Sequence, residues 1–190
     1  MDRRERLHAA LSGGRPDRVP VSAWGHFFAE ETEPQRFARA MLDFRERYDW
    51  DFVKIHSRAS YHVEGWGFTY SPSNDPAKGH RCTGHPIRAV ADWAKLRPLP
   101  LSTPAFREQF EALEAIRAQA PRDCPLIFTV FSPLDVAEKL IDRDSATLKR
   151  HIEENPAALE AALGAFAETF AALVRELPKH GVDGIYFSTK

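Results

Sequence analysis

The sequence predicts an α/β fold of the TIM (β/α)8 barrel type, of which the 190 residues cover about the first four strand–helix units. Apolar segments typical of strands alternate with segments whose apolar residues recur at helical spacing. The segment CPLIFTVFS (124–132) is continuously apolar, as expected for a strand buried on both faces of a parallel sheet. Four strands cannot close a barrel, which typically takes about 250 residues. The alternative is an open four-stranded layer, whose last strand would be an apolar edge.

The composition excludes several classes of protein. Hydrophobic residues make up 43% and charged residues 28%, which is ordinary for a globular domain, and the net charge of −1 provides no bulk attraction for nucleic acid or acidic membranes. No apolar run approaches the roughly 20 residues of a membrane span, and the charged segment MDRRERLHAALSGG is unlike a signal peptide. Two cysteines, Cys82 and Cys124, argue against a disulfide framework. We therefore expect a cytoplasmic protein without nucleic-acid or membrane partners.

The first quarter of the chain contains two predicted strand–helix units. Arg3–Leu11 is expected to form a short helix that ends at a pair of glycines. Arg18–Ala23 is predicted as the first strand, where Pro20 is tolerable only near the strand's beginning. Pro34 begins a helix with apolar residues on one face. Trp50–Ser57 is predicted as the second strand.

Residues 59–100 form a long irregular stretch that is rich in Gly, Pro, Ser and Asn. Apolar residues alternate at Trp66, Phe68 and Tyr70, and apolar residues return at Ile87 and Val90. This pattern predicts a β-hairpin flap rather than disorder. Loops of this length in a compact domain usually cover a site or have a function.

The second half of the chain contains the remaining predicted elements. Helix starts are indicated by Pro at the first helical position after a capping residue, and helix ends by Gly and basic residues. The predicted elements are a helix over Thr103–Gln119, a strand over 124–132, a short helix over 132–141, a helix over Ser145–Glu153, a long helix from Pro156 to about Leu177, and a strand over 183–188.

Candidate site residues follow from the rule that barrel chemistry lies at the carboxyl ends of the strands. His26 and His56 follow different predicted strands, so we predict that they converge and act as catalytic residues. The alternative is that the aromatic residues are core and that each histidine is simply a hydrogen-bonding group. The predicted substrate-binding residues at the strand ends are Trp24, Gly25, Phe27, Arg58, Phe131 and Ser188.

Metal ligands and carboxylates give weaker signals. His80, Cys82 and His85 are metal-ligand types within a short loop, but no second half of a site accompanies them, so no metal site is predicted. The glutamates that follow the first predicted strand are expected to lie in a solvated loop: Glu30, Glu31 and Glu33.

Several segments together resemble the uroporphyrinogen decarboxylase family along the whole chain. RERLHAALSGGRPDRVPVSAW is similar to the family's opening helix, turn and first strand, and DWDFVKI to its second strand. CPLIFTVFSPLDVAEKLI resembles the third strand with its helix, and LVRELPKHGVDGIYFST resembles the fourth strand with the helix before it. The resemblance implies the N-terminal part of a TIM barrel in a cytoplasmic, often dimeric protein that acts on tetrapyrroles.

The family contains two chemistries. One branch decarboxylates the acetate groups of uroporphyrinogen without a cofactor. The other transfers methyl groups to or from corrinoids and uses zinc to activate a thiol. The decarboxylases have an arginine-rich segment after the first strand and an aspartate after the second. In this chain the segment after the first predicted strand is WGHFFAEE, which contains no arginine. The segment after the second predicted strand is His56-Ser57-Arg58, which contains no carboxylate.

These departures favour corrinoid-dependent methyl transfer, with zinc and a corrinoid as implied cofactors and a corrinoid protein as a possible partner. The family's zinc motif is His-x-Cys with a distant Cys, and HRC (80–82) matches its short part but lies in the predicted flap. The zinc is therefore not assigned to this segment. The alternatives are a non-catalytic tetrapyrrole-binding member or an inactive half-barrel, and the isolated segment is expected to be inactive.

Overall fold

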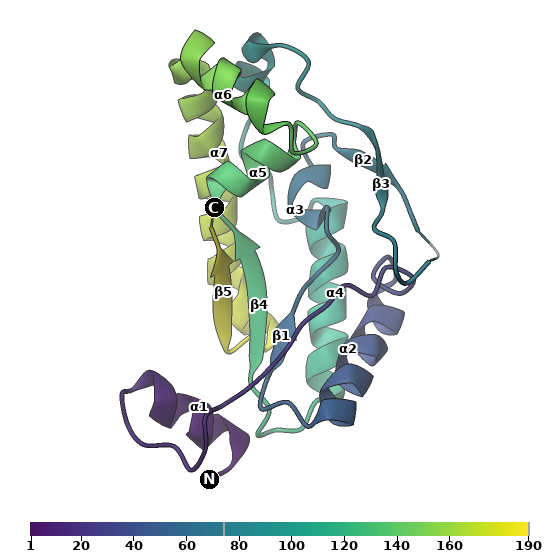
Figure 1. The fold of residues 1–190 in the computed structure, drawn as a ribbon, viewed down its shortest axis with the longest axis vertical. Coiled ribbons are helices and arrows are strands. Elements are labelled where there is room, and N and C mark those ends of the chain that lie inside the picture. The colour runs from purple at the N-terminus through teal and green to yellow at the C-terminus, as the bar shows by residue number, and fades with distance from the viewer. Residues whose placement is uncertain (74, 190) are drawn as a thin grey trace.

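The computed structural model describes residues 1–73 and 75–189 and contains two sheets (Figure 1). The larger sheet has three parallel strands in the order β1-β4-β5, and the smaller sheet is an antiparallel hairpin of β2 and β3. The strands are β1 (Val53–Ile55), β2 (Thr69–Ser71), β3 (Arg81–Gly84), β4 (Leu126–Phe131) and β5 (Gly184–Ser188).

Helices connect the parallel strands, as a βα alternation predicts. The six predicted helices are confirmed to within a few residues, and the three longest begin at a proline. The short α3 and the two 3-10 helices have no counterpart in the prediction. The helices are α1 (Arg3–Leu11), α2 (Pro34–Tyr48), α3 (Tyr61–Glu64), η1 (Val90–Lys95), α4 (Pro104–Gln119), α5 (Pro133–Lys139), α6 (Ser145–Glu154), α7 (Pro156–Glu176) and η2 (Leu177–His180).

The first predicted strand is wrong, because Arg18–Ala23 is extended but forms no ladder. Its backbone meets only the turn before β1, where the Asp51 amide donates to the Val21 carbonyl at 2.9 Å. The Val21 amide donates to the Asp51 carboxylate at 2.8 Å instead of to a strand, and Pro20 has no amide to donate. The described sheet therefore has three strands rather than four.

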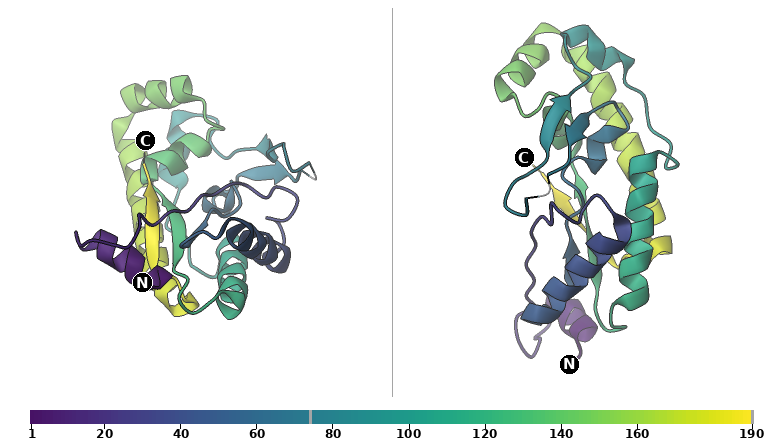
Figure 2. Two further views of the ribbon diagram at one scale, coloured as in Figure 1. Left: turned by 60° about the horizontal axis from the view of Figure 1, so that its bottom comes forward. Right: turned by 90° about the vertical axis from the view of Figure 1, so that its right-hand side faces the viewer.

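The buried Asp51 carboxylate ties the N-terminal segment to the amino end of the sheet. It accepts hydrogen bonds from Arg6 at 2.7 Å and from Arg18 at 2.6 and 2.7 Å. Burial by itself would raise the pKa of Asp51, but the Val21 amide and the two arginines outweigh burial and hold it below its ordinary value. α1 consequently lies at the opposite end of the molecule from α6 (Figures 1 and 2).

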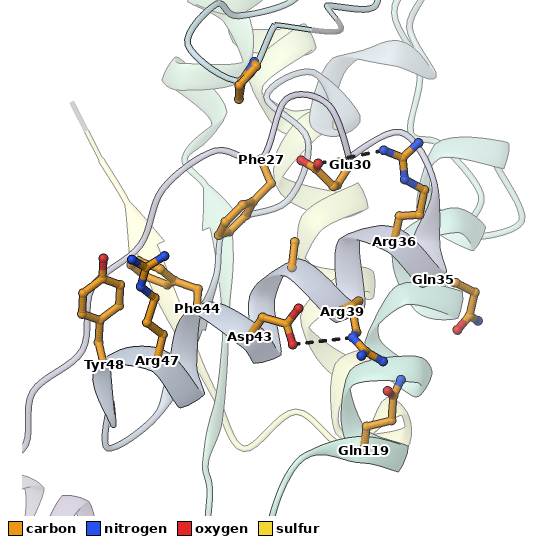
Figure 3. Close-up of a pocket in the computed structure, with 12 residues that line it drawn as sticks. Phe27, Glu30, Gln35, Arg36, Arg39, Asp43, Phe44, Arg47, Tyr48 and Gln119 are labelled. Carbon is orange, nitrogen blue, oxygen red and sulfur yellow. Dashed lines mark ion pairs between the residues drawn. The ribbon is translucent and has the colours of Figure 1, made fainter.

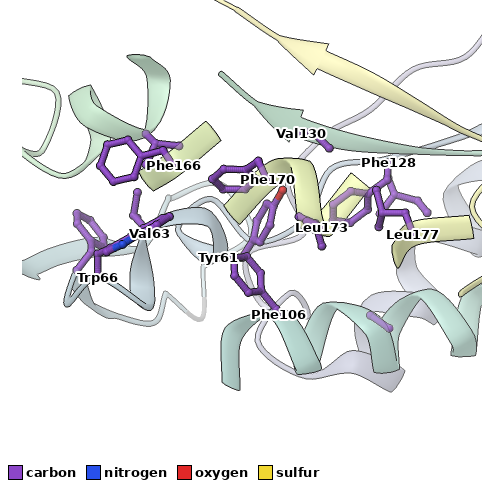
Figure 4. Close-up of a cluster of buried hydrophobic side chains, with 14 of the residues drawn as sticks. Tyr61, Val63, Trp66, Phe106, Phe128, Val130, Phe166, Phe170, Leu173 and Leu177 are labelled. Carbon is purple, nitrogen blue, oxygen red and sulfur yellow. The ribbon is translucent and has the colours of Figure 1, made fainter. Parts of the chain in front are cut away.

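The core lies between one face of the parallel sheet and helices α4 and α7 (Figure 4). Alternate residues of β4, including Phe128 and Val130, are buried on this face. Tyr61 of α3 packs edge-on against Phe128, with ring centroids 5.7 Å apart, and donates its hydroxyl to the Thr129 carbonyl at 2.8 Å. These contacts hold α3 against the carboxyl half of β4, next to the strand ends.

α7 continued through η2 is long and apolar enough to span a membrane by length and composition alone, contrary to the expectation from the sequence. Its buried residues recur at intervals of three and four and pack into the core, so core packing accounts for an apolar face. The buried face contains Ala158, Leu159, Ala162, Ala165, Phe166, Thr169, Phe170 and Leu173.

The predicted flap is confirmed as a hairpin, although its strands are shorter than the alternation suggested. Trp66 and Ile87 lie outside the strands and are buried in the core, so they anchor the flap to it. At the other side of the molecule, β5 has no neighbour on its outer edge within the described residues. Ile185, Tyr186 and Phe187 are correspondingly exposed.

Candidate functional site

Aromatic and imidazole rings meet at the carboxyl end of β1. The ring centroid of Trp24 lies 4.0 Å from that of His56, and Phe131 at the end of β4 lies 6.3 Å from His56. Nε2 of His26 lies 3.0 Å from Nε2 of His56. The predicted convergence of the two histidines from separate segments is confirmed, whereas their catalytic role stays a prediction.

Glu31 extends this cluster, and its predicted place in a solvated loop is wrong. Its side chain is completely buried, with Oε2 3.0 Å from His26 Nδ1 and Oε1 3.1 Å from His80 Nε2. The Glu31 amide donates to the Phe27 carbonyl at 2.8 Å, and this turn directs the chain back toward the cluster. A loop has no periodicity, so the sequence contained no pattern that would separate Glu31 from its exposed neighbours.

The hydrogen bonds determine where the ring protons lie when the histidines are neutral. The Ser73 amide donates to His80 Nδ1 at 2.9 Å, so the proton of His80 is on Nε2, facing Glu31. His26 donates from Nδ1 to the Glu31 carboxylate, and its Nε2 is left as an acceptor. His56 must then donate from Nε2 to His26. Nδ1 of His56 remains as a buried nitrogen without a partner among the described residues.

Burial controls the charge of His56 and of His80. Burial, followed by the positive charge of His26 and Lys54, lowers the pKa of His56 to about 3. Burial also lowers the pKa of His80, although Glu31 opposes that change. His56 is therefore neutral at pH 7.

Two predicted substrate-binding residues have side chains that other groups of the protein engage. Arg58 is buried and donates from Nε and Nη2 to Glu64 at 2.8 Å each, and it also pairs with Glu108. Its charge is thus neutralised within the protein. The Phe27 ring packs edge-on against Phe44 of α2, with ring centroids 5.8 Å apart.

Phe27 instead lines a surface groove of about 800 Å³ beside α2 (Figure 3). Its walls carry ion pairs of Arg36 with Glu30 at 3.9 Å and of Arg39 with Asp43 at 3.6 Å. The groove is lined by none of the converging histidines. The two predicted catalytic histidines lie at the carboxyl end of β1 rather than in the groove.

The remaining predicted residues lie near the same edge of the sheet. Ser188 pairs with Phe131 across the end of the sheet, and its carbonyl accepts from the Ser132 amide at 2.9 Å. Gly25 follows Trp24, and a Cβ atom built there meets no atom within 4 Å, so close packing does not require glycine at this position.

The described residues do not fit a zinc ion. Within residues 1–73 and 75–189, no group of three or more His, Cys, Asp or Glu side chains is arranged to hold a metal. His80 is directed to Glu31, and Nε2 of His85 lies 3.5 Å from Arg88 rather than beside a second ligand. No catalytic step is therefore assigned to a metal in this part of the chain.

Parallel strands connected by helices, with the histidine and aromatic cluster at the carboxyl end of β1, are the arrangement found in the TIM-barrel class. The chain belongs to the uroporphyrinogen decarboxylase (URO-D) family, whose sequence profile matches residues 2–189. A methyltransferase from Methanosarcina mazei has a similar fold, with a TM-score of 0.81 and 22% identity over 97% of this chain. This chain covers 58% of the length of that methyltransferase. The family match and the similar fold confirm the predicted fold, which is part of a TIM barrel. A search of curated proteins found no match.

Proposed function

We propose that the protein acts on a tetrapyrrole and that its reaction is corrinoid-dependent methyl transfer. The observation that carries the proposal is the group of aromatic and imidazole rings at the carboxyl end of β1. The Trp24 ring is half-exposed beside the imidazole of His56, and an exposed indole is a group against which a macrocycle can stack. Family membership supports the class of substrate, and the whole protein's partners remain part of the proposal: a corrinoid protein and a second copy in a cytoplasmic homodimer.

The charges at the site favour methyl transfer over decarboxylation. Decarboxylation of a polycarboxylate calls for arginines that bind the substrate's carboxylates in pairs. The segment WGHFFAEE supplies none, and Arg58 is committed to Glu64 and Glu108. The carboxylate nearest the cluster, Glu31, is likewise committed to His26 and His80.

Decarboxylation of porphyrinogen acetate groups is the second candidate, and one observation favours it. Loss of CO₂ leaves a carbanion that must receive a proton, and a histidine backed by a buried carboxylate is a suitable donor. His26 is held in this way by Glu31 at 3.0 Å. In either reaction Glu31 fixes the orientation of His26, and His26 with His56 holds one proton between two nitrogens 3.0 Å apart.

Binding of hydroxocobalamin and of uroporphyrin I to the protein, followed by their absorbance spectra, tests the proposal. We expect Trp24→Ala to weaken binding of the recognised macrocycle about tenfold, corresponding to about 1.4 kcal/mol of lost stacking. Tyr48→Ala is the matched control, because Tyr48 is as exposed as Trp24 but lies at the end of α2. Absence of binding by both macrocycles, or equal binding by the wild type and Trp24→Ala, would refute the proposal.

Turnover then separates the two chemistries and the non-catalytic alternative. Methyl transfer from methylcobalamin to a thiol converts the methyl–cobalt bond into a thioether and leaves cob(I)alamin, which has its own absorbance. We expect His26→Ala and His56→Ala each to lower the turnover of the active protein. Binding of a macrocycle without either reaction would instead identify a binding protein.

A further inference from the structure

Lys54 is a buried cation that the proposed chemistry does not use. It is the central residue of β1, and its neighbours in the strand, Val53 and Ile55, are buried on the helix side, so Lys54 points to the opposite face. Nζ lies 4.2 Å from the ring centroid of Trp24 and 3.6 Å from that of Tyr186 on β5. Only 7% of Lys54 is exposed.

No acid neutralises this ammonium in the part of the chain that the structure describes. The exposed Lys78, Lys95 and Lys179 each form an ion pair with a carboxylate within 3.1 Å, whereas the buried Lys54 forms none. Aromatic faces attract a cation but do not accept its three hydrogen bonds as an anion does. A buried charge is costly unless it is paired. Lys54 therefore lacks an anionic partner among the described residues.

The neighbouring groups do not supply the missing negative charge. His56, two residues further along the chain, is neutral at pH 7, and Arg58 is a cation that is already paired, so neither is an anion. Glu31 is directed to two histidines rather than to Lys54. Burial lowers the pKa of Lys54 to about 8, so most of the molecules keep the charge at neutral pH.

The geometry points to Lys54 as the anion-binding residue of the site, which takes a ligand with an anionic oxygen group attached to a flat ring system. The anionic oxygens contact Nζ, and the flat part lies against Trp24 and Tyr186, whose rings are both about half exposed. This inference rests on the proposed function for the place of the site, and it adds the charge of the ligand. A carboxylate and a phosphate both meet the requirement.

Three small probes that share a phenyl ring test the inference: benzoate, its neutral analogue benzamide, and phenyl phosphate. Binding is measured by NMR of protein labelled with ¹³C at the lysine ε-carbons, which also follows the pKa of Lys54. We expect benzoate or phenyl phosphate to bind at least tenfold more tightly than benzamide and to raise the pKa of Lys54 above its value in the free protein. The tighter of the two anions identifies carboxylate or phosphate as the natural group.

Variants show whether Lys54 is responsible. Lys54→Met should weaken anion binding at least tenfold, while Lys54→Arg, which keeps the charge and the packing, should retain most of it. Lys139→Met is the matched control, because Lys139 also lies over an aromatic ring, that of Phe68 at 4.8 Å, but away from the cluster. Folding of each variant is checked by its urea midpoint, and Lys54→Arg keeps the test valid if Lys54→Met unfolds.

Equal binding of benzoate, phenyl phosphate and benzamide, or unchanged anion binding in Lys54→Met, would overturn the inference. The outcome is separable from that of the proposed function. If Lys54-dependent anion binding is found but neither macrocycle binds, the anion site stands and the tetrapyrrole proposal fails. If a macrocycle binds through Trp24 but no anion binds through Lys54, the opposite holds.

Discussion

Acidification from pH 7 to pH 5 should destabilise the protein through His56. The pKa of His56 is about 3 in the folded protein, because the ring is buried and lies near the charges of His26 and Lys54, against an ordinary value of 6.5. As the pH falls below 6.5, His56 binds a proton in the unfolded chain but stays neutral in the folded protein. Stability is therefore present above pH 6.5 and is lost as the pH falls toward 3.

The magnitude follows from the distance between pH 5 and the ordinary pKa. Each pH unit below 6.5 costs about 1.4 kcal/mol, so His56 alone removes about 2 kcal/mol of unfolding free energy by pH 5. This is a large fraction of the 5–15 kcal/mol that is typical of a folded domain. The buried His62 has a pKa well below its ordinary value and acts in the same direction, so a variant is needed to isolate His56.

Urea unfolding at pH 7 and pH 5 measures the effect, with constant m-values as the check on two-state behaviour. The wild type should lose about 2 kcal/mol more than His56→Gln between the two pH values. His8→Gln, which removes a histidine from α1 at the other end of the molecule, should follow the wild type. If His56→Gln loses as much stability as the wild type, the reasoning from burial is wrong.

Three further substitutions test individual contacts. Asp51→Ala should cost about 3–5 kcal/mol of unfolding free energy, because two arginines lose their buried partner, and a loss below about 1 kcal/mol in urea would contradict this. Gly181→Ala should cost about 1–2 kcal/mol, since φ is +77° and the new Cβ meets a side chain at 2.5 Å, whereas Gly25→Ala, with free space, should melt with the wild type. Glu31→Gln should shift the proton of His26 away from Nδ1, visible in ¹⁵N NMR, and lower turnover; an unchanged spectrum would show that the carboxylate does not position the ring.

The sequence by itself determined the periodic elements and the side of the sheet on which the histidines lie. Helices α2, α4 and α7 begin at prolines and have apolar faces, and β4 is continuously apolar, so short-range patterns define all four. The convergence of His26 and His56 was predicted from the rule that the carboxyl ends of parallel strands meet at one edge of a sheet. In the structure His26 follows a segment that forms no ladder, and it still lies beside His56.

Only the tertiary structure decided which polar groups are buried and what they contact. Residues 18–23 have a strand-like composition but form no ladder, because a strand needs a partner that offers a matching row of hydrogen bonds. Glu31 and His80 come from loops without periodicity, and their contact depends on how the turn and the flap fold back. Lys54 looks like an ordinary surface lysine in the sequence, and its burial between two rings arises from strands that are more than 100 residues apart along the chain.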